Sequence, residues 1–110
     1  MAYVAKHKYA PVSARKARLV IDLIRGKTVD GAMAVLRRCP QKSARFIEKV
    51  VKSAQANAED RGANDEMLVA RAWVDESFQI KRATARARGR SALIRKRRSH
   101  IVVELAAKEQ

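Results

Sequence analysis

The feature that most restricts the fold of this chain is a basic segment, residues 81–100, with strand-forming sequence on both sides. The segment holds nine Lys or Arg residues and no Asp or Glu. Residues 67–80 before it and 101–105 after it are rich in residues that favour β-strands. Because the segment contains one glycine, Gly89, and no proline, the simplest arrangement is one long antiparallel hairpin with its tip near Arg88 and Gly89.

This predicted hairpin is long enough to extend beyond a body of this size. From Gln79 to the tip is about ten residues, which at ~3.4 Å each gives an arm of roughly 34 Å. A compact domain of this length has a radius of gyration of about 13 Å. A two-residue turn at the tip would place Arg82 opposite Arg95 and Lys81 opposite Lys96, and directly opposed like charges destabilise a strand pair. We therefore expect the arm to be stabilised by a polyanion.

The N-terminal part of the chain predicts an edge strand followed by a helix. Residues 1–9 alternate loosely between apolar and basic side chains, as a short edge strand does. Ser13 is a suitable N-cap for a helix over residues 14–25, and Gly26 is a suitable stop. The apolar stripe of this helix is predicted to be Ala17, Val20, Leu23 and Ile24.

Two more helices are predicted before the basic hairpin. Asp30 is the expected N-cap of a short helix that ends before Pro40. A longer helix is expected over about residues 41–60, with Gly62 beyond it. The buried side chains of the short helix are expected to be Ala32, Val35, Leu36 and Cys39. Those of the longer helix are expected to be Ile47, Val50, Val51, Ala54 and Ala58.

Together these elements predict an α+β fold, with helices against a small antiparallel sheet. The 110 residues suffice for one domain. We expect a body of about residues 1–78 and 101–110, and a protruding basic hairpin of about residues 79–100. Ile101, Val103 and Leu105 should point to one face of the sheet. The aromatic residues Phe46 and Trp73 are assigned to the core.

The charge of the chain indicates a polyanionic partner. Lys and Arg number 25 against 11 Asp and Glu, a formal net charge of +14. Such an excess is typical of nucleic-acid binding first and of anionic membrane surfaces second. Within residues 81–100, arginine outnumbers lysine seven to two. Arginine makes bidentate phosphate contacts and stacks on exposed bases, which favours folded RNA over duplex DNA.

A second basic patch precedes and covers the first predicted helix. For each member, phosphate contact and an ordinary solvent-exposed helix face are equally good interpretations. Asp22 is spaced to form an ion pair with Arg18 or Arg25. The patch consists of Lys6, His7, Lys8, Arg15, Lys16, Arg18, Arg25 and Lys27.

The remaining residue patterns argue against chemistry, a disulfide or a membrane span. His7 and His100 lie far apart without donors at ligand spacing, so we expect no metal, no cofactor and no catalysis. The single cysteine, Cys39, excludes an intrachain disulfide and fits a reducing compartment. No apolar run is long enough to span a membrane, and the N-terminus lacks the core of a signal peptide, so an intracellular location is expected. No dimer seam is visible, and self-association is not expected.

Four short sequences occur in an order that resembles a known family. They are SARKARLVIDLIRGK at 13–27, SAQANAED at 53–60, KRATARARGR at 81–90 and RSHI at 98–101. Together they resemble the bacterial large-subunit ribosomal protein twenty-two family, and the resemblance covers essentially the whole chain. It implies three helices against a small antiparallel sheet, in a protein of the cytoplasmic ribosome.

The resemblance also implies partners and binding residues. In that family the hairpin threads between segments of large-subunit (23S-type) ribosomal RNA, and its tip helps line the nascent-peptide exit tunnel beside a second ribosomal protein. The residues that match the tip are Lys81, Arg82, Arg86, Arg88, Gly89 and Arg90. Those that match the returning strand are Arg95, Lys96, Arg97 and Arg98. Ala85 stands where the family commonly has proline, which leaves the backbone of the tip less restricted.

Three other functions are compatible with parts of this pattern. A DNA-binding protein of the nucleoid would use the same charge, and would bind duplex DNA as well as RNA. An RNA-processing enzyme would require His7 or His100 to act in catalysis. A membrane-surface protein would require a basic amphipathic helix with a broad aromatic face, which the sequence lacks.

Overall fold

The computed structural model describes residues 2–63, 66–85 and 91–107, with the backbone alone for 78–85 and 91–96. Its elements are β1 (Ala2–Ala10), α1 (Ala14–Ile21), α2 (Val29–Arg38), α3 (Lys42–Asp60), β2 (Met67–Ala85) and β3 (Ser91–Ala107). The three strands form one antiparallel sheet in the order β1-β3-β2. The predicted α+β architecture is confirmed, with β1 at one edge of the sheet.

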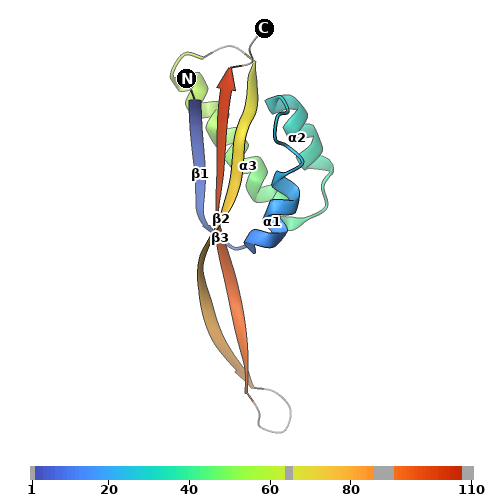
Figure 1. The fold of residues 1–110 in the computed structure, drawn as a ribbon, viewed down its shortest axis with the longest axis vertical. Helices are drawn as coiled ribbons and strands as arrows, with labels where there is room; N and C mark the ends of the chain where they lie inside the picture. The colour runs from blue at the N-terminus through green and yellow to red at the C-terminus, as the bar shows by residue number, and fades with distance from the viewer. Residues whose placement is uncertain (1, 64–65, 86–90, 108–110) are drawn as a thin grey trace.

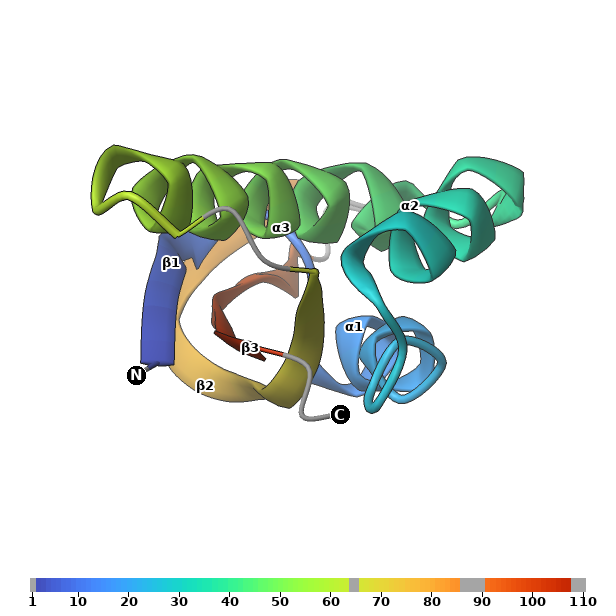
Figure 2. The ribbon, with the colours of Figure 1, turned by 90° about the horizontal axis from the view of Figure 1, so that it is seen from above.

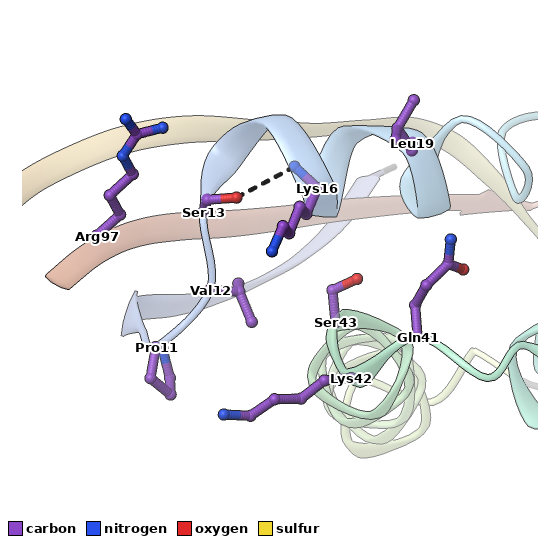
Figure 3. Close-up of a pocket in the computed structure, with 9 residues that line it drawn as sticks. All are labelled: Pro11, Val12, Ser13, Lys16, Leu19, Gln41, Lys42, Ser43 and Arg97. Carbon is purple, nitrogen blue, oxygen red and sulfur yellow. Dashed lines mark hydrogen bonds between the residues drawn. The ribbon is translucent and has the colours of Figure 1, made fainter. Parts of the chain in front are cut away.

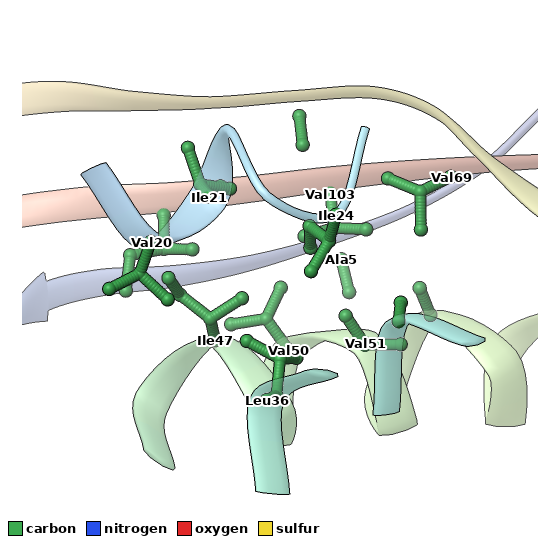
Figure 4. Close-up of a cluster of buried hydrophobic side chains, with 14 of the residues drawn as sticks. Ala5, Val20, Ile21, Ile24, Leu36, Ile47, Val50, Val51, Val69 and Val103 are labelled. Atoms are coloured by element: carbon green, nitrogen blue, oxygen red, sulfur yellow. The ribbon is translucent and has the colours of Figure 1, made fainter. Parts of the chain in front are cut away.

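The helices pack on one face of the sheet and enclose the core. Figures 1 and 2 show α3 lying across β1 and β3, with α1 beside β2. Ile101, Val103 and Leu105 share one face of the sheet as predicted, and all three are fully buried. The five predicted core residues of α3 are also buried. Figure 4 shows how side chains from α1, α2, α3 and the sheet meet: among them are Val20, Ile21, Ile24, Leu36, Ile47, Val50, Val51, Val69 and Val103.

Helix α1 is shorter than predicted. It begins after Ser13, whose side chain accepts a hydrogen bond from the Lys16 amide as expected, but it ends at Ile21. The prediction that Leu23 is buried is wrong, since this side chain is 48% exposed, while Ile21 is fully buried. The chain leaves the helix early and turns through Gly26, which adopts a left-handed φ of +78°.

Pairing with the edge of β2 explains this early exit. The Gly26 amide donates to the Val69 carbonyl, and the Val69 amide donates to the Lys27 carbonyl, each at 2.9 Å. Thr28 continues the contact through an isolated bridge to Leu68. These bonds satisfy backbone groups on the outer edge of β2, so a tertiary contact replaces another helical turn.

Helix α2 begins two residues earlier than predicted. Its N-cap is Thr28, whose hydroxyl accepts from the Gly31 amide at 3.2 Å, so the assignment of Asp30 as N-cap is wrong. Asp30 lies in the first turn instead, where a carboxylate interacts favourably with the helix dipole. The helix ends at Arg38, and Cys39 is buried. The prediction that Val35 is buried is wrong, since this side chain is partly exposed, while Met33 is buried.

The assignment of Trp73 to the core is wrong because β2 contains a bulge. The register of β2 against β3 shifts between Val69 and Arg71, so that Ala72 and Val74 take the buried positions. Trp73 therefore lies on the face of the sheet away from the helices, with the Arg71 guanidinium 5.4 Å from its ring centroid. Phe46, in contrast, packs against the core.

Beyond the body, β2 and β3 continue as a two-stranded arm (Figure 1). The molecule extends 65 Å along its longest axis against 25 and 16 Å along the others, and its radius of gyration is 16.9 Å. These dimensions confirm the protruding hairpin. The predicted register of the arm is wrong by one residue: Lys81 pairs with Arg95, and Arg82 pairs with Ile94.

The difference from the predicted register arises from the pairing next to the tip, and not from the bulge at the base of the arm. A bulge between Glu76 and Gln79 adds one residue to β2 where the arm leaves the body. The last described pair is Ala85 with Ser91, a register that a two-residue turn at 88 and 89 does not produce. The predicted tip itself, at residues 86–90, lies outside the described residues.

Candidate nucleic-acid interface

Two arginines of the predicted second patch attach the α1 segment to β2. The Arg18 Nε and Nη2 atoms donate to the Val74 carbonyl at 3.0 and 2.9 Å. The Arg25 Nε atom donates to the Ala72 carbonyl at 2.8 Å, and Arg25 also forms the predicted ion pair with Asp22. These contacts close the outer edge of β2. Since a guanidinium has five N–H donors, both side chains keep donors for a further partner.

The base of the arm, which we call the neck, brings the two predicted basic regions together. The neck comprises Arg97 and Arg98 of β3 and the facing start of α1, with Arg15 and Lys16. A small cleft of about 40 Å³ lies between them, lined by Ala14, Arg15, Glu76, Ser77, Arg97 and Arg98. The first helix and the hairpin therefore present one basic surface rather than two.

At the opposite side of the neck, side chains of β3 hold a bulge in β1. The β1 register shifts between His7 and Ala10, and Tyr9 adopts a φ of 59°. Its amide donates to His100 Nδ1 at 3.1 Å, and its carbonyl accepts from Arg98 Nη1 at 3.3 Å. The His100 ring also contacts the Tyr9 ring, with centroids 4.8 Å apart. His100 and Arg98 thus support the backbone of β1.

The remaining predicted residues fall into three groups. The side chains of Lys6, Lys8, Arg15, Lys16, Lys27 and Arg97 are exposed. Lys81, Arg82, Arg95 and Lys96 lie on the two strands of the arm, where Lys81 and Arg95 are cross-strand partners. Arg86, Arg88, Gly89 and Arg90 lie outside the described residues. His7 differs from all of these, because its ring packs 5.5 Å from the Phe46 ring against the body.

One acidic side chain, Glu76, lines the neck cleft, and other acids lie elsewhere on the body. Glu48 on α3 is shared by three cations, with N···O distances of 3.0 Å to Arg45, 3.7 Å to Lys52 and 3.8 Å to Arg37. A depression at the far end of the body, where β2 begins, is lined by three acids, Asp30, Glu59 and Glu66. The acidic depression therefore lies at the end of the body away from the arm, whereas the neck combines Glu76 with several cations.

A groove next to the neck was not predicted from the sequence. It has a volume of about 820 Å³ and lies between the starts of α1 and α3 (Figure 3). Its lining is Pro11, Val12, Ser13, Lys16, Leu19, Gln41, Lys42, Ser43 and Arg97. Lys42 is the functional candidate that sequence reasoning missed. Its place in the first turn of a helix is visible in the sequence, but the meeting of two helix starts depends on tertiary packing.

Two negative findings concern the described residues. No three His, Cys, Asp or Glu side chains among them lie close enough to hold a metal ion. No helix in this part of the chain is long and apolar enough to cross a membrane.

A small α+β body with a long arm whose sequence holds nine cations and no acid between residues 81 and 100 is typical of proteins that bind nucleic acid. Residues 5–106 match the family model of ribosomal protein L22p/L17e, so the chain belongs to this family of ribosomal proteins. It is accordingly a structural protein of the ribosome and not an enzyme.

Relatives from several bacteria show the same similarity over nearly the whole chain. The large ribosomal subunit protein uL22 of Sulfurihydrogenibium sp. is 49% identical over 104 residues, covering 94% of this chain and 90% of the relative. The uL22 proteins of Carboxydothermus hydrogenoformans and Desulforamulus reducens are 49% and 48% identical over 105 residues, covering 94% of this chain and 93% of each relative.

Proposed function

We propose that the protein is a structural constituent of the large ribosomal subunit that binds large-subunit ribosomal RNA through its arm and neck. The observation that carries this proposal is the charge of the arm. Nine cations between residues 81 and 100 have no acidic residue among them. The two strands of the arm also place Lys81 opposite Arg95. RNA phosphates inserted along both strands would supply the missing negative charge.

The neck extends this binding surface onto the body. Arg15, Lys16 and Arg97 are exposed there, and they lie on the side of the body away from its acidic depression. A polyanion approaching the molecule is therefore attracted to the arm and neck and repelled from the far end. We propose the exposed cations of β1, Lys6 and Lys8, and Lys27 after α1, as peripheral phosphate contacts.

A salt titration with matched variants tests the RNA proposal. Substituting Arg95, Lys96 and Arg97 by glutamine removes three cations from the arm and neck. If each contacts a phosphate, the slope of log affinity against log salt should become shallower by about two to three. The control removes three cations from the α3 side of the body, by glutamine at Lys49, Lys52 and Arg61, and should leave the slope nearly unchanged. Equal slopes in the two triple variants would contradict the proposal.

A competition experiment separates RNA from DNA. Labelled large-subunit RNA, bound to the protein at moderate salt, is challenged with unlabelled duplex DNA or unlabelled structured RNA. A ribosomal RNA-binding protein should release its RNA to the RNA competitor at much lower concentration. Equal competition by duplex DNA would favour the nucleoid interpretation.

We further propose that the tip of the arm, residues 86–90, helps line the nascent-peptide exit tunnel. Support comes from family membership and from the length of the arm, which carries residues 85 and 91 far beyond the body. Neighbouring ribosomal proteins and the nascent chain would then be the partners of the tip. A photo-crosslinking amino acid at Gly89 should capture nascent peptide in stalled ribosomes, whereas one at Lys49 should not. Absence of the Gly89 product would refute the tunnel assignment.

A further inference from the structure

We infer that the groove between the starts of α1 and α3 is a specific binding site for a phosphate group of an RNA chain. This inference rests on the proposed RNA-binding function and names a second point of contact on the body. The groove adjoins the neck, because Arg97 lines it as well as the small cleft beside Arg15. An RNA strand that follows the arm onto the body would therefore reach it.

The start of α3 supplies donors for an anion. The N-cap position is Gln41, and its side chain makes no capping hydrogen bond to the helix. The Gln41 side-chain oxygen instead accepts from the Cys39 thiol at 2.6 Å. The first amides of a helix have no intrahelical acceptor, and together with the helix dipole they favour a negatively charged ligand. At 19 residues, α3 is the longest helix described.

Ser43 provides independent support for an anion site in the groove. It lies in the first turn of α3 and is 4% exposed, and its hydroxyl has no hydrogen-bond partner in the described structure. A buried hydroxyl without a partner is unusual and calls for an explanation. Figure 3 shows the Ser43 side chain directed toward α1, into the space that Lys16 also enters. The hydroxyl oxygen is itself covered in the free protein, so a phosphate oxygen in the groove would accept a hydrogen bond from it once a side chain of the lining shifts.

The charge of the lining also matches a phosphate. Lys16, Lys42 and Arg97 come from three different elements, and none of the nine described lining residues is acidic. The rest of the lining includes apolar groups of Pro11, Val12 and Leu19, of which Leu19 is 63% exposed. A volume of about 820 Å³ exceeds what a phosphate alone requires. The attached sugar or an unstacked base would contact the apolar part.

The first experiment uses the full chain, labelled with ¹⁵N, and inorganic phosphate as the probe. Phosphate should shift the amide resonances of Lys42, Ser43 and Ala44 saturably, relative to chloride at matched ionic strength. Ser43→Ala and Lys42→Gln should each weaken this binding by about tenfold, the effect of losing one hydrogen bond to a charged group. The control Lys49→Gln removes an equal charge from an exposed site on the same helix, and should change affinity less than about twofold.

Thermal melting distinguishes a binding role of Ser43 from a structural one. Because its hydroxyl has no partner in the free protein, Ser43→Ala should melt at the wild-type temperature or above it. A lower melting temperature would mean that the hydroxyl is already bonded within the protein, and would overturn this part of the inference.

Binding to large-subunit RNA identifies the source of the phosphate. Lys42→Gln should weaken RNA binding several-fold, whereas Lys49→Gln should not. Phosphate shifts at α3 without an effect of Lys42→Gln on RNA affinity would show a site for free anions, which overturns the RNA assignment. Normal RNA binding without phosphate shifts would refute the groove and leave the proposed function intact. Wild-type protein that binds no RNA would refute the proposed function itself.

Discussion

The arginines of α1 allow structural and RNA-binding roles to be separated by one pair of variants. Arg18 donates two hydrogen bonds to the Val74 carbonyl, whereas Arg15, three residues earlier, faces solvent beside the neck. We predict that Arg18→Met destabilises the free protein and that Arg15→Met does not. Methionine keeps much of the apolar stem and removes the charge and the donors.

The size of the effect follows from the contact. A hydrogen bond from a charged group contributes about 1.5–3 kcal/mol when it is well shielded. Arg18 is exposed apart from its contact with β2, so water compensates part of the loss, and we expect about 1–2 kcal/mol. For a domain of this length, that corresponds to a melting temperature lower by roughly 4–8 °C. Arg15→Met should stay within about 0.5 kcal/mol of wild type.

Two measurements test this prediction. Thermal or urea unfolding should place Arg18→Met clearly below Arg15→Met in stability. Titration with large-subunit RNA, well below both melting temperatures, should show the reverse order, with Arg15→Met the weaker binder. Equal melting temperatures would mean that the Arg18–Val74 contact contributes little. Equal stability losses in both variants would refute the separation of roles.

Three further predictions concern the core, a turn and the neck. Ile47→Asp should leave the domain unfolded at 25 °C, because it places an unpaired charge at a fully buried site of α3; a native circular dichroism spectrum would contradict this. Gly26→Ala should cost about 1 kcal/mol in urea unfolding, since the left-handed φ of +78° is strained for alanine even though nothing lies within 4 Å of the new Cβ; unchanged stability would show that the turn relaxes. Arg97→Glu should lower the yield of assembled large subunits, whereas Lys49→Glu should not; equal yields would exclude Arg97 from RNA contact.

Much of the fold follows from local patterns in the sequence. The apolar stripe of α3 and the alternation of Ile101, Val103 and Leu105 predict their buried faces correctly, because periodicity reflects the geometry of one element alone. The Ser13 cap is correct for the same reason. The strands on either side of the basic segment predict the protruding hairpin, since a single glycine and no proline leave few alternatives.

The errors arise where one element depends on another. α1 ends early because Gly26 and Lys27 pair with Val69, a partner far away in the sequence. Trp73 faces outward because β2 contains a bulge that alternation alone does not reveal. The arm register differs because the pairing of Ala85 with Ser91 does not fit the assumed two-residue turn.

The sequence predicts which cations belong to the candidate site, but it does not predict how they are arranged on the surface. From the sequence, Arg15, Arg18 and Arg97 are equally good candidates for RNA contact. Only their tertiary contacts show that they have different roles. Arg18 is bonded to β2, whereas Arg97 lies between the cleft and the groove. The groove at Lys42 and Ser43 requires the starts of two helices to meet, which no local pattern encodes.

Both strands of the arm are direct continuations of strands that the body already holds in register. Val74 pairs with Ile101 and Glu76 pairs with Ser99, so the two strands are aligned before they leave the body. Strand pairing in the arm can therefore propagate outward from these pairs. Every member of the buried apolar cluster that the structure describes lies between residues 3 and 74 or between residues 101 and 105. Pairs of residues could therefore be added to or removed from the two strands without repacking the interior. The length of the arm can thus change, in evolution or by design, independently of the body.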